Sequence, residues 1–129
     1  MSGSHRQWLR GDEKRAEVRR VWAEWFESYD ALLCPVMPTA AISHQQEGDI
    51  FDRSIEINGE SVPYINLISW TGFIGITCLP SAVPPIGRTP GGLPVGVQVV
   101  TPYLRDRDAI ALAGHLADLV GGYDVPPGF

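Results

Sequence analysis

Apolar residues recur every three to four positions between residues 12 and 29, in the stretch DEKRAEVRRVWAEWFESY. The members of this stripe are Val18, Val21, Trp22, Trp25, Phe26 and Tyr29. Their spacing places them on one face of an α-helix, with charged residues on the opposite face. Two tryptophans and a phenylalanine on one stripe favour burial, so we expect this helix to pack against strands that contain Leu32 and Val97.

Shorter patterns predict β-structure after this helix. The continuous apolar run from Ala31 to Val36 is typical of a strand buried on both faces. Residues 43–53 are polar and are typical of a loop. Residues 54–62 alternate around Asn58-Gly59, a dipeptide that adopts positive φ easily and favours a type I′ turn. This segment therefore predicts a short hairpin.

The second half of the chain predicts a helix, two strands and a final helix. The apolar residues 64–73 indicate a short buried helix. Two strands are expected over residues 78–84 and 93–100, separated by a turn-rich segment. The final helix is expected over residues 106–120, with Asp106 as its N-cap and Gly121 as its C-cap.

The composition is that of one folded domain. Hydrophobic residues make up 44% of the 129 residues and charged residues 19%, which argues against disorder. We expect residues 1–129 to form a single α/β domain, with loose tails at about residues 1–7 and 121–129. A net charge of −5 disfavours nucleic acid as a partner.

The cellular compartment is predicted from what the sequence does not contain. Only two cysteines occur, Cys34 and Cys78, and they form no CxxC pair, which fits a reducing compartment. No apolar run reaches the ~20 residues of a membrane span. The first residues lack the apolar core of a signal peptide. We therefore expect a cytoplasmic protein without a membrane partner.

No self-contained catalytic constellation is visible in the sequence. There is no GxSxG elbow, no HExxH, no glycine-rich phosphate loop and no metal-type Cys/His spacing. Cys34 and Cys78 lie in apolar strand contexts, where a buried thiol stays protonated and inert. We therefore predict no catalytic residue, no metal ligand and no cofactor in this chain.

Several blocks in order resemble a known family. Leu79-Pro-Ser-Ala-Val-Pro84 is followed by Ile86-Gly87 and by Gly92-Leu-Pro-Val-Gly-Val-Gln98. Upstream, Tyr29-Asp-Ala-Leu-Leu-Cys-Pro35 follows a Trp/Phe-rich helix. This order resembles the C-terminal segment of amidase signature enzymes, from about Trp8 to Val120. The resemblance implies a fragment of that α/β fold, a partial mixed sheet with flanking helices.

The resemblance also implies a chemistry that this chain lacks. Amidase signature enzymes use a Ser–Ser–Lys triad, in which a serine attacks the amide carbonyl and a lysine held neutral takes up its proton. The sequence has no Gly/Ser-rich stretch, and its only lysine, Lys14, is on the charged face of the first helix. No residue of this chain corresponds to a member of that triad, so we expect the chain to be inactive alone. Cys78 stands where many relatives have glycine.

The same resemblance suggests a pocket wall. In such enzymes the segment before the Pro-rich strand lines the acyl pocket, and here that segment contains Trp70, Phe73 and Ile74. These three residues are candidate substrate-binding residues, and the alternative is that they are simply core. In a complete enzyme the ligand would be a small-molecule amide.

Three functional readings stay open at this point. The first is an amidase segment that is inactive alone and is completed by a missing N-terminal part. The expected protein partner is that missing part or a second copy of this chain in a homodimer. The second is a stand-alone α/β module that binds a partner without chemistry. The third is a fragment of an amidotransferase A-type subunit. Triad residues encoded upstream would favour the first or third reading over the second.

Overall fold

The first helix begins earlier than the apolar stripe predicts. The computed structural model describes residues 4–126 and residue 128, and α1 spans His5–Trp25. Ser4 closes a capping box: its hydroxyl accepts from the backbone N–H of Gln7 at 3.3 Å, and its own N–H donates to the Gln7 side chain at 2.8 Å. The expected loose segment 1–7 is therefore helical from His5 onward, and residues 1–3 lie outside the described residues.

The main sheet is built around one long strand. Strand β6, Pro94–Val100, pairs antiparallel with β1 (Leu32–Pro35), β4 (Ser81–Ala82) and β5 (Pro85–Arg88). The α/β class is confirmed, but every pairing among the described residues is antiparallel. The parallel component of the expected mixed sheet is thus not formed within the part of the chain that the structure describes. A tight turn joins β5 to β6, which only an antiparallel pair allows.

A separate hairpin follows the polar loop, as the sequence predicts. Strands β2 (Ser54–Ile57) and β3 (Glu60–Pro63) pair antiparallel through Asn58 and Gly59, whose φ angles are 54° and 83°. Both positive values fit the expected type I′ turn. The helix expected over 64–73 is divided into a 3₁₀ turn, η1 (Tyr64–Ile68), and an α-helix, α2 (Ser69–Ile76).

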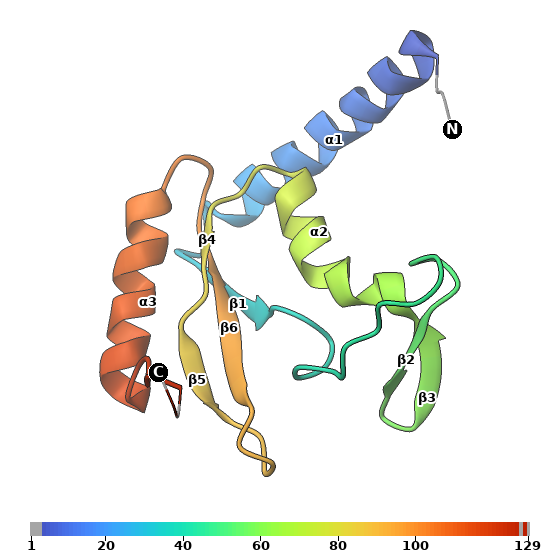
Figure 1. The fold of residues 1–129 in the computed structure, drawn as a ribbon. Helices are drawn as coiled ribbons and strands as arrows, with labels where there is room; N and C mark the ends of the chain where they lie inside the picture. The colour runs from blue at the N-terminus through green and yellow to red at the C-terminus, as the bar shows by residue number, and fades with distance from the viewer. Residues whose placement is uncertain (1–3, 127, 129) are drawn as a thin grey trace.

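The last helix, α3, spans Asp106–Val120 and covers one face of the sheet over β4, β5 and β6 (Figure 1). Gly121 ends it in the left-handed region at φ 103°, as expected. The N-cap assignment was wrong: Arg105 occupies that position without a side-chain cap. Asp106 is instead the first helical residue, where its negative charge interacts favourably with the positive N-terminal end of the helix dipole. Residues 121–126 form no helix or strand.

The opposite face of the sheet carries the small core. Cys34, Ile74 and Val100 are buried there, and Trp22 of α1 and Phe26, the residue that follows the helix, pack against them. No residue of α1 is itself buried, and Figure 1 shows its N-terminal half extending away from the rest of the chain. The expected docking of the whole stripe is therefore only partly correct. Its last turns reach the end of β6 at Val100, whereas Val18 and Val21 remain exposed.

The chain exposes much more surface than a complete domain of its mass. Its accessible surface is 9,726 Å². A globular monomer of 14.1 kDa exposes about 6,700 Å², so the surplus is roughly 3,000 Å². Large apolar side chains account for part of it, among them Trp8, Val21, Phe51, Ile68 and Ile76. Surface of this kind is normally covered by another part of a fold or by a partner. In the described part of the chain, no helix combines the length and apolarity needed to cross a membrane.

Candidate functional site

Helix α2 carries the three predicted pocket residues but does not present them equally. Ile74 is only 2% exposed and belongs to the core with Cys34 and Val100. Trp70 and Phe73 are 38% and 49% exposed. The ring of Phe73 lies 5.7 Å from that of Trp22 on α1. The side chains of Trp70 and Phe73 are therefore accessible to a ligand or to a neighbouring segment. The burial of Ile74 favours the alternative interpretation, that it is a core residue.

The two cysteines differ, contrary to the sequence-based expectation that both are buried. Cys34 on β1 is buried, and desolvation raises the pKa of its thiol above the ordinary value, which keeps it protonated and unreactive. Cys78 is exposed. It follows the C-terminus of α2 in the left-handed region, at φ 59°, and its N–H donates to the carbonyl of Gly75 at 3.0 Å. Glycine is the usual residue at this position after a helix.

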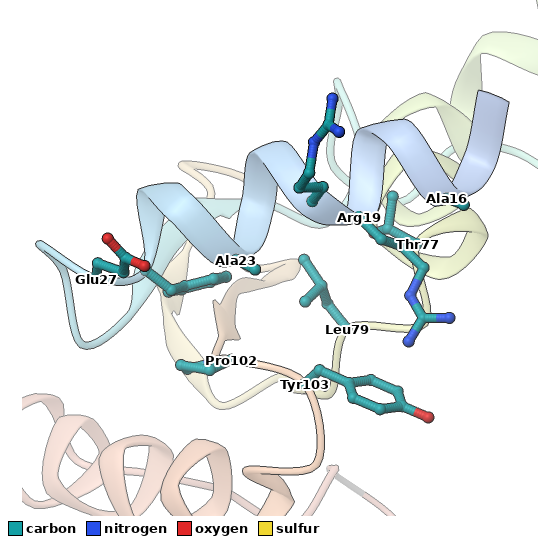
Figure 2. A pocket seen from close by; sticks show the side chains of 10 residues that line it. Ala16, Arg19, Ala23, Glu27, Thr77, Leu79, Pro102 and Tyr103 are labelled. Atoms are coloured by element: carbon teal, nitrogen blue, oxygen red, sulfur yellow. The ribbon is translucent and has the colours of Figure 1, made fainter. Parts of the chain in front are cut away.

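An open groove lies between α1 and the loop that follows β6. Its volume is about 490 Å³, which is in the range of small-molecule sites. Figure 2 shows α1 along one side and Pro102 and Tyr103 along the other, with Leu79 between them. The groove is lined by Ala16, Arg19, Arg20, Ala23, Phe26, Glu27, Thr77, Leu79, Pro102 and Tyr103.

The charged groups of this groove can bind but supply no nucleophile. The guanidinium of Arg19 stands 4.5 Å from the ring centroid of Tyr103, within cation–π distance. The lining contains no serine, cysteine, histidine or lysine, and the hydroxyl of its threonine, Thr77, is buried and donates to the carbonyl of Ile74 at 2.8 Å. An activated hydroxyl or thiol with an adjacent base is therefore absent from it. Sequence reasoning missed this groove, because Arg19 and Tyr103 are 84 positions apart and no local pattern links them.

Outside this groove, the described residues were also compared with two other kinds of site, a lysine base and a bound metal ion. Lys14, the one lysine of the sequence, is exposed on α1. Among residues 4–126 and 128, no three His, Cys, Asp or Glu side chains lie close enough together to hold a metal ion. The described residues thus provide apolar surfaces and exposed charged groups that could bind a ligand.

Comparison with known proteins gives the context for this arrangement. The family model described as Amidase matches residues 1–110. The chain belongs to the amidase family. The A-type subunit of glutamyl-tRNA(Gln) amidotransferase from Granulibacter bethesdensis is 30% identical over 109 residues, which cover 84% of this chain and 20% of that protein. Its counterpart from Leptospira interrogans is 27% identical over 107 residues, 83% of this chain and 20% of that protein. Fatty-acid amide hydrolase 2-A of Danio rerio is 41% identical over 58 residues, 45% of this chain and 11% of that protein.

The fold of the family is shared as well. A solved structure described as the crystal structure of amidase superposes with a TM-score of 0.78 at 25% identity, covering 92% of this chain and 26% of that one. This amidase-family chain thus corresponds to about a fifth to a quarter of the length of the relatives it matches. The large exposed surface agrees with that partial coverage.

The left-handed conformation of Cys78 gives a testable consequence. Cys78→Gly is expected to raise the free energy of unfolding by about 0.5–1 kcal/mol. A side chain in the left-handed region costs about 1–2 kcal/mol, and the greater unfolded-state entropy of glycine offsets part of the gain. Urea melts measure the change. Cys78→Ala is the control, because it removes the thiol and keeps the strain. Equal stabilisation by alanine would show that the thiol, and not the backbone, is unfavourable.

Proposed function

We propose that this chain is a non-catalytic segment of an amide C–N hydrolase, in which the triad is supplied by another segment. The observation that carries the proposal is a family match over residues 1–110 in a chain whose only lysine is solvent-exposed. Burial favours the neutral lysine that a Ser–Ser–Lys triad requires, and Lys14 is exposed on α1. In this proposal the chain contributes part of the hydrophobic core and part of the wall of the substrate pocket, and the reacting groups come from another segment.

The wall in this proposal is the exposed side of α2. Trp70 and Phe73 are half-buried aromatic side chains on a helix whose other side is anchored in the core by Ile74. An anchored helix holds such rings rigidly, which suits them to line the acyl side of a small-molecule amide site. The partner that completes the site is the remainder of an amidase fold. The two cysteines, both free thiols, support a cytoplasmic setting for it.

A second candidate is a segment of an amidotransferase A-type subunit. It is favoured by the 30% identity to the Granulibacter protein over 84% of this chain. The two candidates share the fold and the missing triad, and they differ in the amide, which would be glutamine for the amidotransferase. The net charge of −5 disfavours tRNA contact through this segment.

The proposal predicts that the purified chain hydrolyses no amide. A panel of aryl amides, alkyl amides and glutamine is incubated with the chain, and product formation at the rate of the blank is expected. The reason is that, among the described residues, no hydroxyl or thiol is hydrogen-bonded to a histidine or to Lys14. Turnover that follows the protein through purification and is lost with Cys34→Ala or Cys78→Ala would contradict the proposal. It would favour a cysteine-based reaction instead.

A further inference from the structure

The groove between α1 and the loop after β6 is a concave site whose two walls both belong to this chain (Figure 2). On the α1 side, Ala16 and Ala23 line it. They are seven residues apart, or about two helical turns, so they lie on the same side of the helix. Their small side chains leave the space that Arg19 and Tyr103 border. No other segment is needed to complete the groove, and its volume of about 490 Å³ suits a small molecule.

The apolar part of the groove is held by the core. Phe26 and Leu79 line the groove and also pack against the buried cluster of Cys34, Ile74 and Val100. A surface that the core already holds in place loses little conformational freedom when a ligand binds. An apolar ligand group can therefore lie on Phe26 and Leu79 without a large ordering cost.

Arg19 supplies a positive charge at the wall of the groove. Its guanidinium reaches from α1 to the ring of Tyr103 on the opposite wall, 4.5 Å from the ring centroid. This cation–π contact fixes the position of the charge. Arg19 takes part in none of the ion pairs of the described residues, so no carboxylate in that part of the chain neutralises it.

The N–H groups of Arg19 are available to a ligand. Among the described residues, the arginines whose side chains donate hydrogen bonds are Arg15, Arg53, Arg88 and Arg105. The guanidinium of Arg19 thus keeps its donors unused while the Tyr103 ring holds it in place. Paired guanidinium N–H groups match the two oxygens of a carboxylate, which they bind through two parallel hydrogen bonds.

The charge of the lining favours a ligand with one negative charge. The charged lining residues are Arg19, Arg20 and Glu27, two positive groups and one negative group, which gives a formal net charge of +1. Arg20 also lies 3.9 Å from Glu24. A polyanion would meet Glu27 in the groove and a net charge of −5 on the whole chain.

We infer that this groove binds a small monocarboxylic acid with an apolar or aromatic body. The carboxylate is bound by the guanidinium of Arg19, and the body lies on Phe26 and Leu79. The site is distinct from the exposed side of α2, because neither Trp70 nor Phe73 lines it. The inference does not depend on the proposed hydrolase role.

Phenylacetate is a suitable probe, and phenylacetamide is its matched control, since it has the same shape without the charge. In a titration followed by NMR, phenylacetate is expected to shift the backbone amide resonances of Leu79 and Tyr103, with a dissociation constant of about 1–10 mM. Phenylacetamide is expected to bind about tenfold more weakly, because it forms no charge-assisted hydrogen bonds with Arg19. Acetate, which has the charge without the ring, is expected to bind about tenfold more weakly as well.

Two arginine substitutions separate the site from the overall charge of the helix. Arg19→Gln is expected to raise the dissociation constant for phenylacetate at least fivefold and to remove the preference for the acid over the amide. Arg10→Gln is the matched control, because it makes the same charge change at an exposed position about 2.5 turns earlier on α1. It is expected to change the constant by less than about twofold.

Three results would overturn the inference. The first is equal affinity of the wild-type chain for phenylacetate and phenylacetamide, or no binding of either. The second is an equal loss of affinity in Arg19→Gln and Arg10→Gln. The third is a set of resonance shifts confined to residues outside the groove. The comparison of acid and amide uses the wild-type chain, so it decides the question even if a variant does not fold.

Discussion

Trp22→Ala is expected to lower the free energy of unfolding by about 3 kcal/mol, at the lower end of the range for a large aromatic truncated to alanine because the ring is only partly buried. Trp22 joins α1 to the rest of the chain, as does Phe26 just beyond the end of the helix. Its ring lies 5.7 Å from that of Phe73 on α2, and it packs against the cluster of Cys34, Ile74 and Val100. Losing it removes contacts between elements far apart in sequence. Urea unfolding followed by circular dichroism measures the loss.

Trp25→Ala is the matched control for this experiment. The aromatic neighbours of Trp25 are Trp22, Phe26 and Tyr29, all within α1 or the turn that follows it. Their contact stabilises the helix end locally, at about 0.5–1.5 kcal/mol for an aromatic pair. Trp25→Ala should therefore cost about 1 kcal/mol. If both substitutions lowered the free energy of unfolding equally, Trp25 would also contribute to the packing of α1 against the rest of the chain, and the packing described above would be incorrect.

Gly96→Ala is expected to cost about 2 kcal/mol, the second large effect. Gly96 lies on β6, where the segment before β5 passes close over it. A Cβ added there would lie 2.9 Å from a methyl group of Val83 and 3.2 Å from the carbonyl oxygen of Pro84. That oxygen also accepts the N–H of Val97 at 3.2 Å, so the backbone cannot move away without weakening a hydrogen bond.

Gly91→Ala tests whether the cost comes from this close approach. Gly91 lies in the turn between β5 and β6, and an added Cβ would meet only the Thr89 hydroxyl, at an ordinary 3.8 Å. Alanine there should leave the stability unchanged or raise it slightly, through reduced unfolded-state entropy. The midpoint of thermal unfolding distinguishes the two substitutions. Similar losses at both glycines would indicate that the turn, and not the crossing at Gly96, is the sensitive element.

The sequence by itself determined the features that depend on neighbours along the chain. The period of apolar residues predicted α1 and α3, and Gly121 marked the end of α3 through its positive φ. Asn58-Gly59 predicted the hairpin, because these two residues adopt the left-handed turn at little cost. The order of the Leu-Pro-rich blocks predicted the amidase family, which the family match confirms. The Trp70 and Phe73 pocket assignment stays a prediction.

Tertiary structure decided which side of each element is covered. Helical spacing placed Trp22 and Val21 on one stripe, but only Trp22 reaches the core, because α1 contacts the sheet through its last turns. Ile74 and Phe73 are adjacent in sequence, yet only Ile74 is buried. The left-handed Cys78 and the contact of Arg19 with Tyr103 have no local signal. Burial and pairing of this kind depend on segments distant along the chain, whose approach local periodicity does not specify.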